Sequence, residues 1–382
     1  MKIGILTQPL HNNYGGLLQN YALQQVLKGL GHEVETVDWF PEKAGALKVW
    51  LWQKKELLLS LMLKDRERPR YQLTEKEEEV IGRNTHHFTN KYITVCPKKV
   101  GRVEGFNGID TEYGYDAYIV GSDQVWRPSY NSTMMPAMFL GFTDRDDVKR
   151  IAYAASFGTS DWEFLPALTE VCARFAKKFD CITVREKSGV DLCREHLGVD
   201  ATWVLDPTML LNHEDYEKLV VAENEAKSAG TLFHYILDPS EEKKALIERV
   251  AEEKGLKPFT IMPKCQAENR SKWDVKHRIE ACVFPSVTSW LRGFMDAEMV
   301  IVDSFHGAVF SIIFNKPFWV IGNSKRGNAR FESLLGLFGL EDRMITPWDE
   351  FEWNKEIDWG KVNEIREREK EKSLKTFEVL SK

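Results

Sequence analysis

One histidine, His306, stands where a polar side chain could do chemistry. It lies in the stretch Asp303 to Gly307, which directly follows the apolar run Val300 to Val302 and precedes a helix-like run. This order predicts a strand, a tight turn and a helix, with the aspartate or Ser304 as the N-cap. Ligands bind at the carboxyl ends of parallel strands, and free N–H groups of a helix N-terminus favour anions. We therefore predict that His306 is catalytic and that Ser304 and Gly307 hold an anion; the alternative is a structural histidine.

Three cations follow the next apolar run, 318–321. Lys325, Arg326 and Arg330 stand in the glycine-bearing loop 322–330, so the same edge of the sheet would carry them. Guanidinium and ammonium groups in such a cluster suit a phosphate. The pattern fits either a phosphate clamp beside the histidine or a solvated basic surface.

Polar residues also follow two strands predicted earlier in the chain. Asp123, Gln124 and Trp126 come after the apolar run 115–120, and Arg185 comes directly after 181–184. Carboxylate and amide groups beside an aromatic ring have the composition of a sugar site. For Trp126 a place in the core is the alternative, and for Arg185 an ion pair with a neighbouring glutamate.

The first loop is a further candidate for ligand binding. After strand 2–7 the chain runs through Asn12, Asn13, Gly15 and Gly16 into a helix, but the loop lacks the GxGxxG pattern of dinucleotide-binding proteins. Two glycines before a helix let a ligand approach the backbone closely. A plain tight turn is the alternative.

The elements that position these residues alternate between strand and helix. Strand-like runs at 33–39 and 150–155 and helix-like runs at 165–179 and 188–197 complete one unit, and the pattern starts again after Pro207. Such alternation predicts parallel sheets covered by helices. We predict an α/β protein with two Rossmann-like domains facing a cleft: residues 1–205 on the acceptor side and residues 206–345 on the donor side.

Two segments depart from the alternation. Residues 43–99 form a charged, mostly helical insert, and residues 346–382 form a helical tail that could cross back to the first domain. The front of the insert, residues 47–64, mixes Trp50, Trp52 and leucines with lysines. This pattern fits a helix packed on its own domain or over the cleft, or one lying on a membrane surface.

Composition narrows the class of protein. The chain has 382 residues and a net charge of −6, which argues against general nucleic-acid binding. Its six cysteines show no metal-ligand spacing, and no apolar run is long enough to cross a membrane. We expect a cytoplasmic protein with reduced thiols and without a metal site.

An ordered set of motifs resembles the polysaccharide pyruvyl transferase family. The set consists of NNYGG at 12–16 with QNYAL at 19–23, DAYIVGSDQVW at 116–126, AYAASFG at 152–158, VRE at 184–186, VLDPT at 204–208 and DSFHG at 303–307. The resemblance implies a fold of the glycosyltransferase B type. It also implies transfer of a carboxyethylidene group from phosphoenolpyruvate to two hydroxyls of a sugar in a surface polysaccharide or its lipid-linked precursor, with no cofactor.

The resemblance also implies roles for individual residues. His306 would be the acid or a close partner of the phosphate, and Arg185 with Lys325 or Arg326 would hold the donor. Many members of the family carry an arginine two residues before this histidine, where this chain has Ser304. Either Arg326 or Arg330 replaces that charge, or donor use differs. A sugar-nucleotide-dependent glycosyltransferase and a non-catalytic glycan-binding relative are the alternatives.

Overall fold

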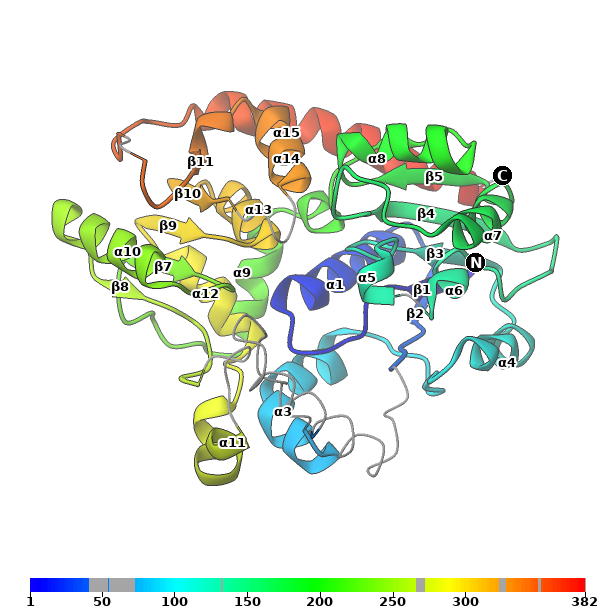
Figure 1. Ribbon diagram of the computed structural model, residues 1–382, viewed down its shortest axis with the longest axis horizontal. Coiled ribbons are helices and arrows are strands. Elements are labelled where there is room, and N and C mark those ends of the chain that lie inside the picture. The colour runs from blue at the N-terminus through cyan, green and yellow to red at the C-terminus, as the bar shows by residue number, and fades with distance from the viewer. Residues whose placement is uncertain are drawn as a thin grey trace.

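The computed structural model contains two parallel β-sheets, each with helices on both faces (Figure 1). It describes residues 1–40, 54, 73–131, 133–265, 272–322, 328–349 and 352–381. The predicted α/β class with two Rossmann-like domains is confirmed. The strands of both sheets are mostly buried, as expected for parallel sheets covered on both sides.

The first sheet has the strand order β2-β1-β3-β4-β5-β6. Its strands are β1 (Lys2–Leu6), β2 (Glu33–Thr36), β3 (Ala117–Val120), β4 (Lys149–Ala155), β5 (Cys181–Val184) and β6 (Thr202–Trp203). The helices of this part are α1 (Tyr14–Gly29), α3 (Glu75–Tyr92), α4 (Val103–Tyr113), α5 (Pro128–Asn131), α6 (Met135–Met138), α7 (Pro166–Ala176) and α8 (Lys187–Leu192), with a π-helical turn Cys193–Leu197 and a 3-10 turn Pro207–Leu210. The strand order reverses between β1 and β3, which opens a crevice at their carboxyl ends.

The second sheet has the order β11-β10-β9-β7-β8. Its strands are β7 (Leu232–Tyr235), β8 (Pro258–Phe259), β9 (Met299–Val302), β10 (Phe318–Ile321) and β11 (Met344–Ile345). Its helices are α9 (His213–Ala222), α10 (Glu241–Lys254), α11 (Lys272–Arg278), α12 (Val287–Asp296), α13 (Phe305–Ile313) and α14 (Ala329–Phe338), with 3-10 turns Ile279–Cys282 and Glu341–Arg343. Here the order reverses between β7 and β9, so the second crevice lies at the end of β9, before α13.

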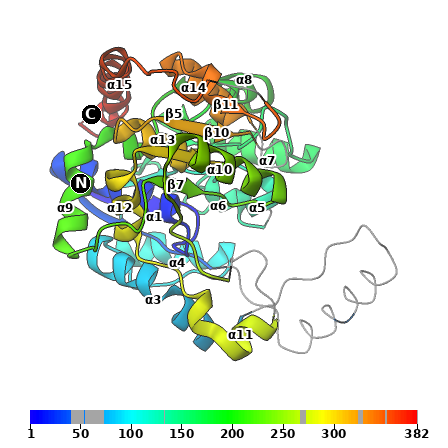
Figure 2. The same ribbon diagram turned by 90° about the vertical axis from the view of Figure 1, so that its left-hand side faces the viewer.

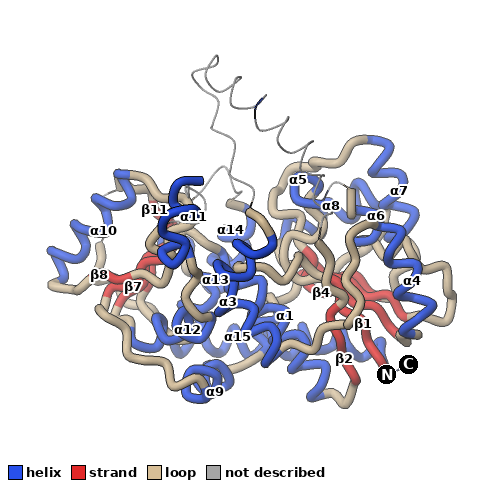
Figure 3. The backbone as a smooth tube through the Cα atoms, turned by 90° about the horizontal axis from the view of Figure 1, so that it is seen from below, coloured by secondary structure: helices blue, strands red, loops and turns tan. Residues whose placement is uncertain are grey.

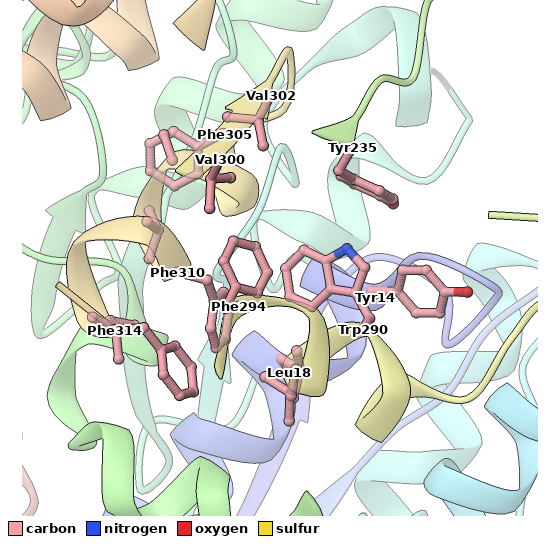
Figure 4. Close-up of a cluster of buried hydrophobic side chains, with 14 of the residues drawn as sticks. Tyr14, Leu18, Tyr235, Trp290, Phe294, Val300, Val302, Phe305, Phe310 and Phe314 are labelled. Atoms are coloured by element: carbon pink, nitrogen blue, oxygen red, sulfur yellow. The ribbon is translucent and has the colours of Figure 1, made fainter. Parts of the chain in front are cut away.

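The two sheets share a hydrophobic core at their junction. Tyr14 and Leu18 of α1 pack among Trp290, Phe294 and Phe310 of the second sheet's helices (Figure 4). The rings of Tyr14 and Trp290 stack with centroids 5.7 Å apart, and the Tyr14 hydroxyl donates to the carbonyl of Pro285 at 3.0 Å. Helices therefore fill the space between the two groups of strands, as Figure 3 shows.

A second set of contacts joins the sheets below this core. Helices α3 and α11 lie side by side in Figures 1 and 2. Arg83 pairs with Glu280 at 2.7 Å, and Lys276 pairs with Glu77 at 2.7 Å. These pairs connect α3 with α11 and the 3-10 turn that follows it.

The C-terminal helix α15 (Trp359–Leu374) and the 3-10 turn Lys375–Ser381 return to the first sheet (Figure 1). The hydroxyl of Ser373 accepts a hydrogen bond from the Leu205 amide at 3.0 Å. Phe377 stacks on Tyr153 of β4 with centroids 4.8 Å apart. The tail thus contacts the start of the segment that connects the two sheets, and the first sheet itself.

The segment proposed above for a membrane surface, residues 47–64 with Trp50 and Trp52, lies outside the described residues except for Lys54. No helix among the described residues combines the length and the apolar character that crossing a membrane requires.

Candidate active site

His306 lies in the first turn of α13, immediately after β9. The hydroxyl of Ser304 accepts from the Gly307 amide at 3.1 Å, so the serine, not the aspartate, is the side-chain N-cap. Asp303 accepts instead from the amides of Leu237 and Asp238 and from the Lys243 ammonium, at 2.6, 3.0 and 2.7 Å. Asp303 therefore ties the loop after β7 to the start of α13.

A cavity of about 270 Å³ lies where α13 faces the first sheet. The predicted residues that line it are Asn13, Gly15, Asp123 and Gln124 from the first sheet's side and Ser304, His306 and Arg330 from the second. These residues come from loops and helix starts that follow β1, β3, β9 and β10. The rule that strand ends gather ligand-binding side chains accounts for their meeting.

A buried ion network forms the floor of this cavity. The guanidinium of Arg185 donates to Asp206 Oδ2 at 2.9 Å and to Asp123 Oδ1 at 3.2 Å. Asp206 also accepts from the hydroxyls of Ser122 at 3.0 Å and Thr208 at 2.7 Å. The Arg185 side chain is 1% exposed, so it orients the two carboxylates and does not itself reach the cavity.

Burial and charge compete in this network. Burial raises the pKa of Asp206, but His306 and Arg185 lower it by more, so the pKa lies well below its usual range. The pKa of Asp123 is likewise lowered, because Arg185, His306 and Arg330 outweigh the effect of burial. Both carboxylates are therefore ionised at neutral pH, and the two aspartates raise the pKa of Arg185 despite its burial.

The imidazole of His306 lies between this floor and α1. Its Nε2 is 3.6 Å from Asp206 Oδ2, which is ion-pair distance but too long for a hydrogen bond, and no other described group bonds it. A Cβ placed on Gly15 would lie 2.2 Å from His306 Cγ and Nδ1. The ring is thus held between a carboxylate and a bare stretch of helix backbone.

Arg330 supplies a guanidinium on the same side of the cavity. It stands in the first turn of α14 and is 7% exposed. Its guanidinium carbon lies 5.9 Å from the ring centroid of Phe305, and that of Arg185 lies 4.4 Å from the same ring. Burial and the Arg185 charge lower the pKa of Arg330 to about 10, which still leaves it charged at neutral pH.

Not every predicted residue reaches the cavity. Trp126 is fully buried, with its ring stacked on Phe139 at 4.6 Å and its indole N–H donating to the Met138 carbonyl, so it belongs to the core. The Asn12 side chain accepts from Thr85 of α3, and Gly16 lies within α1. A Cβ on Gly307 would lie 2.7 Å from its own cap, Ser304 Oγ, which gives this glycine a packing role.

Lys325 and Arg326 lie outside the described residues. Other residues of the site were not among the predicted ones, including Asp206 in the floor and His11 and Tyr130 in the cavity wall. Asp206 follows β6 as Asp123 follows β3, so its place at a strand end was the available signal.

The sequence model of one family, polysaccharide pyruvyl transferase, matches residues 13–325. The chain belongs to this family. The matched range includes the loop at Asn13, the ion network and His306, and it ends within the basic loop before α14. Membership in the polysaccharide pyruvyl transferase family identifies a transferase that acts on a sugar or polysaccharide.

A solved structure supports the fold of this family member. UGT89C1 of Arabidopsis thaliana, solved with UDP-L-rhamnose, is 9% identical with a TM-score of 0.50, and the match covers 98% of each chain. The UDP-GlcNAc 2-epimerase of Methanocaldococcus jannaschii is 12% identical with a TM-score of 0.48, covering 96% of this chain and 92% of that one. The expected glycosyltransferase B-like architecture is confirmed. No curated protein matches the chain.

Among the described residues, histidine, cysteine, aspartate and glutamate side chains nowhere gather in a group of three that could hold a metal ion.

Proposed function

We propose that the chain moves a carboxyethylidene group from phosphoenolpyruvate to two hydroxyls of a sugar in a surface polysaccharide or its precursor. One observation carries the proposal. Two basic residues of the second domain, His306 and Arg330, face Asp123 and Gln124 of the first domain across one cavity. The first pair suits a donor with phosphate and carboxylate groups, and the second pair suits sugar hydroxyls.

The donor would lie on the α13 side of the cavity. Arg330 offers a guanidinium, and the first turn of α13 offers backbone N–H groups that favour an anion. The Ser304 hydroxyl, which the cavity also contacts, offers a hydrogen bond but no charge. Lys325 and Arg326, in the preceding loop, remain part of the proposed donor site.

The reaction needs an acid and an acceptor for the hydroxyl protons. In the proposed order, His306 gives a proton to the methylene carbon of phosphoenolpyruvate, so that C2 becomes oxocarbenium-like. One sugar hydroxyl attacks C2 and loses its proton. The bond from C2 to the phosphate oxygen then breaks, the second hydroxyl attacks, and its proton restores the acid. One ketal and one inorganic phosphate result, and one of the two hydroxyl protons leaves with the phosphate.

Asp123 is the proposed acceptor-binding carboxylate. Its Oδ1 accepts from the backbone N–H of Gln124 at 2.9 Å and from the Arg185 guanidinium, whereas its Oδ2 has no hydrogen-bond partner among the described residues. Since the carboxylate stays ionised, Oδ2 can accept a hydrogen bond from a sugar hydroxyl and orient it toward C2. Arg185 would act as a positioning residue, because it holds this carboxylate from below.

Incubation with phosphoenolpyruvate and candidate glycans, followed by assay of released phosphate, tests the proposal. Release that depends on a glycan supports it, and His306→Ala should lower the rate by about 10²–10⁴-fold, the usual contribution of a general acid. His277→Ala is the control, because that histidine lies on α11, outside the cavity. The proposal would be refuted if no glycan led to phosphate release and calorimetry showed no binding of the donor. Saturable binding of a nucleotide sugar alone would favour a glycosyltransferase, and glycan binding without turnover would favour a non-catalytic relative.

The proposed place of action is the cytoplasm, at the inner face of the membrane where a lipid-linked acceptor would lie. All six cysteines are free thiols, which suits a reducing compartment. For peripheral contact through residues 47–64, flotation with anionic liposomes should be weaker for a Trp50→Ala, Trp52→Ala variant than for the native chain. Equal flotation of the two proteins would remove this contact from the proposal.

A further inference from the structure

The cavity wall contains one aromatic side chain that differs from the others. Among its described tyrosine and phenylalanine residues, Tyr235, Phe305 and Phe331 are 7%, 6% and 2% exposed, whereas Tyr130 is 50% exposed. The first three support the wall from within the core. Tyr130 presents ring surface to whatever occupies the cavity.

The ring of Tyr130 is held in place from its own side of the sheet. The guanidinium carbon of Arg127 lies 5.1 Å from the ring centroid. Arg127 in turn donates to both carboxylate oxygens of Glu163, at 3.2 and 3.1 Å, and to Gln124 Oε1 at 3.0 Å. The Tyr130 amide closes a turn onto the Arg127 carbonyl at 3.1 Å. A fixed arginine therefore fixes the ring, which lowers the entropy lost when a ligand stacks on it.

Polar groups with unused hydrogen-bonding capacity line the same cavity. Asp123 Oδ2 is one of them. The Gln124 amide nitrogen is another, since only the oxygen of that side chain is engaged, by Arg127, among the described residues. The third is the amide nitrogen of Asn13, whose oxygen accepts from the Gly16 amide at 3.1 Å. Together these groups offer one acceptor oxygen and two donor nitrogens.

We propose that Tyr130 is the platform on which the acceptor sugar stacks, with the apolar C–H face of a pyranose ring against the tyrosine. Asp123 and Gln124 then bind the hydroxyls at the sugar's edge and turn them toward the donor. This inference rests on the proposed function and deepens it by naming a pyranose with a continuous C–H face as the acceptor class. It also moves the aromatic part of the site from Trp126 to Tyr130.

Titration with methyl β-glucoside, methyl β-galactoside and methyl β-mannoside, each in the presence of excess phosphoenolpyruvate, tests the platform. For whichever glycoside the native chain binds, Tyr130→Ala should raise the dissociation constant about tenfold, equivalent to about 1.4 kcal/mol. Tyr130→Phe should keep it within about twofold, because stacking uses the ring and not the hydroxyl. The dissociation constant of phosphoenolpyruvate should not change. Trp348→Ala is the matched control, an aromatic residue that is 76% exposed and does not line the cavity.

Three results would overturn the platform. They are equal glycoside affinity in Tyr130→Ala and the native chain, an equal loss of phosphoenolpyruvate affinity in that variant, and no binding of any of the three glycosides by the native chain. Failure of the proposed function looks different. In that case Tyr130-dependent glycoside binding remains, but no phosphate is released from phosphoenolpyruvate.

Discussion

The guanidinium of Arg330 is buried next to another guanidinium, that of Arg185, and both of these features lower its pKa. A bound anion would offset the desolvation and the repulsion together. Since Ser304 stands where many members of the family have an arginine, we assign Arg330 the missing charge. Arg330 lines the cavity from α14. The positive charge at the cavity would therefore come from α14, and not from the start of α13 as in those family members.

Arg330→Met should raise the KM for phosphoenolpyruvate about 10–100-fold, the loss expected for hydrogen bonds to a charged group of about 1.5–3 kcal/mol. Adding Ser304→Arg to this variant should restore part of the affinity, although the lost N-cap lowers stability by about 1 kcal/mol. Steady-state kinetics measures both effects. Arg292→Met is the control, because Arg292 pairs with Asp296 within α12 and does not line the cavity. An unchanged KM in Arg330→Met would contradict the assignment.

Some of these residues can be predicted from the sequence and others cannot, for physical reasons. Polar residues that closely follow an apolar run mark a strand end, and this pattern predicts a site at Asp123, Arg185 and His306. Whether an aromatic residue after β3 faces the core or the cavity depends on the path of the chain into the short helix α5. Trp126, before this helix, is buried in the core, whereas Tyr130, within it, lines the cavity. Asp206 also stands after a strand, but its pairing with Arg185 and Ser122, which are 21 and 84 residues away in the chain, shows only in the folded structure.

At the scale of elements, the N-terminal turns of α1 and α13 are in contact beside the cavity. Gly15 in the first turn of one lies against His306 in the first turn of the other. The contact leaves no room for a side chain at position 15.

The alternation of strands and helices could be predicted because the apolar runs of these elements are long. Helix α4 was not predicted, since only Phe106 and Ile109 of that helix are buried.

Gly15→Ala should displace His306 and lower the rate of phosphate release strongly, by about 10²-fold or more, as expected when a catalytic group is misplaced by about 1 Å. Gly16→Ala is a matched control in the same helical turn. A Cβ at that position would meet its nearest atom, Asn13 Cγ, at 3.4 Å, which is ordinary contact. Crystal structures of the two variants would show whether the ring moves. Equal rates in the two variants would argue against a fixed position of His306.

Strand β7 carries a histidine whose titration affects stability. Burial lowers the pKa of His234 to about 4, against about 6.5 in the unfolded chain. Below pH 6.5 the unfolded state therefore binds a proton that the folded state does not. Stability from this position is lost as the pH falls from about 6.5 to about 4, and the loss levels off below that.

His234→Gln should remove this dependence. Relative to the variant, the native chain should lose about 2 kcal/mol of unfolding free energy between pH 7 and pH 5. Denaturant unfolding of both proteins at the two pH values measures the difference. The buried Asp38, whose pKa is raised to about 6, titrates in the same range but is common to both proteins and cancels. If the native chain and the variant differ in unfolding free energy by the same amount at pH 7 and at pH 5, the lowered pKa of His234 is contradicted.

At the scale of the whole molecule, the two sheets and their helices are joined by one shared hydrophobic core and form a single body. Side chains of α1 and α3 belong to the same hydrophobic cluster as those of α12 and α13. The tail adds a second connection when it returns to β4. Both connections hold Asp123 and His306 on opposite sides of one cavity, although the cavity residues come from two separately built sheets.

Phe377→Ala tests whether the tail is part of this body. The ring is 3% exposed and stacked on Tyr153, so its loss should lower the unfolding free energy by about 3–5 kcal/mol. Leu165→Ala, at a residue that is 74% exposed, should change it by less than about 0.5 kcal/mol. Because the core is shared, Phe377→Ala should still unfold in one transition in calorimetry, shifted to lower temperature. Two separate transitions, with only the first one shifted, would mean that the sheets unfold independently and that the tail stabilises the first sheet alone.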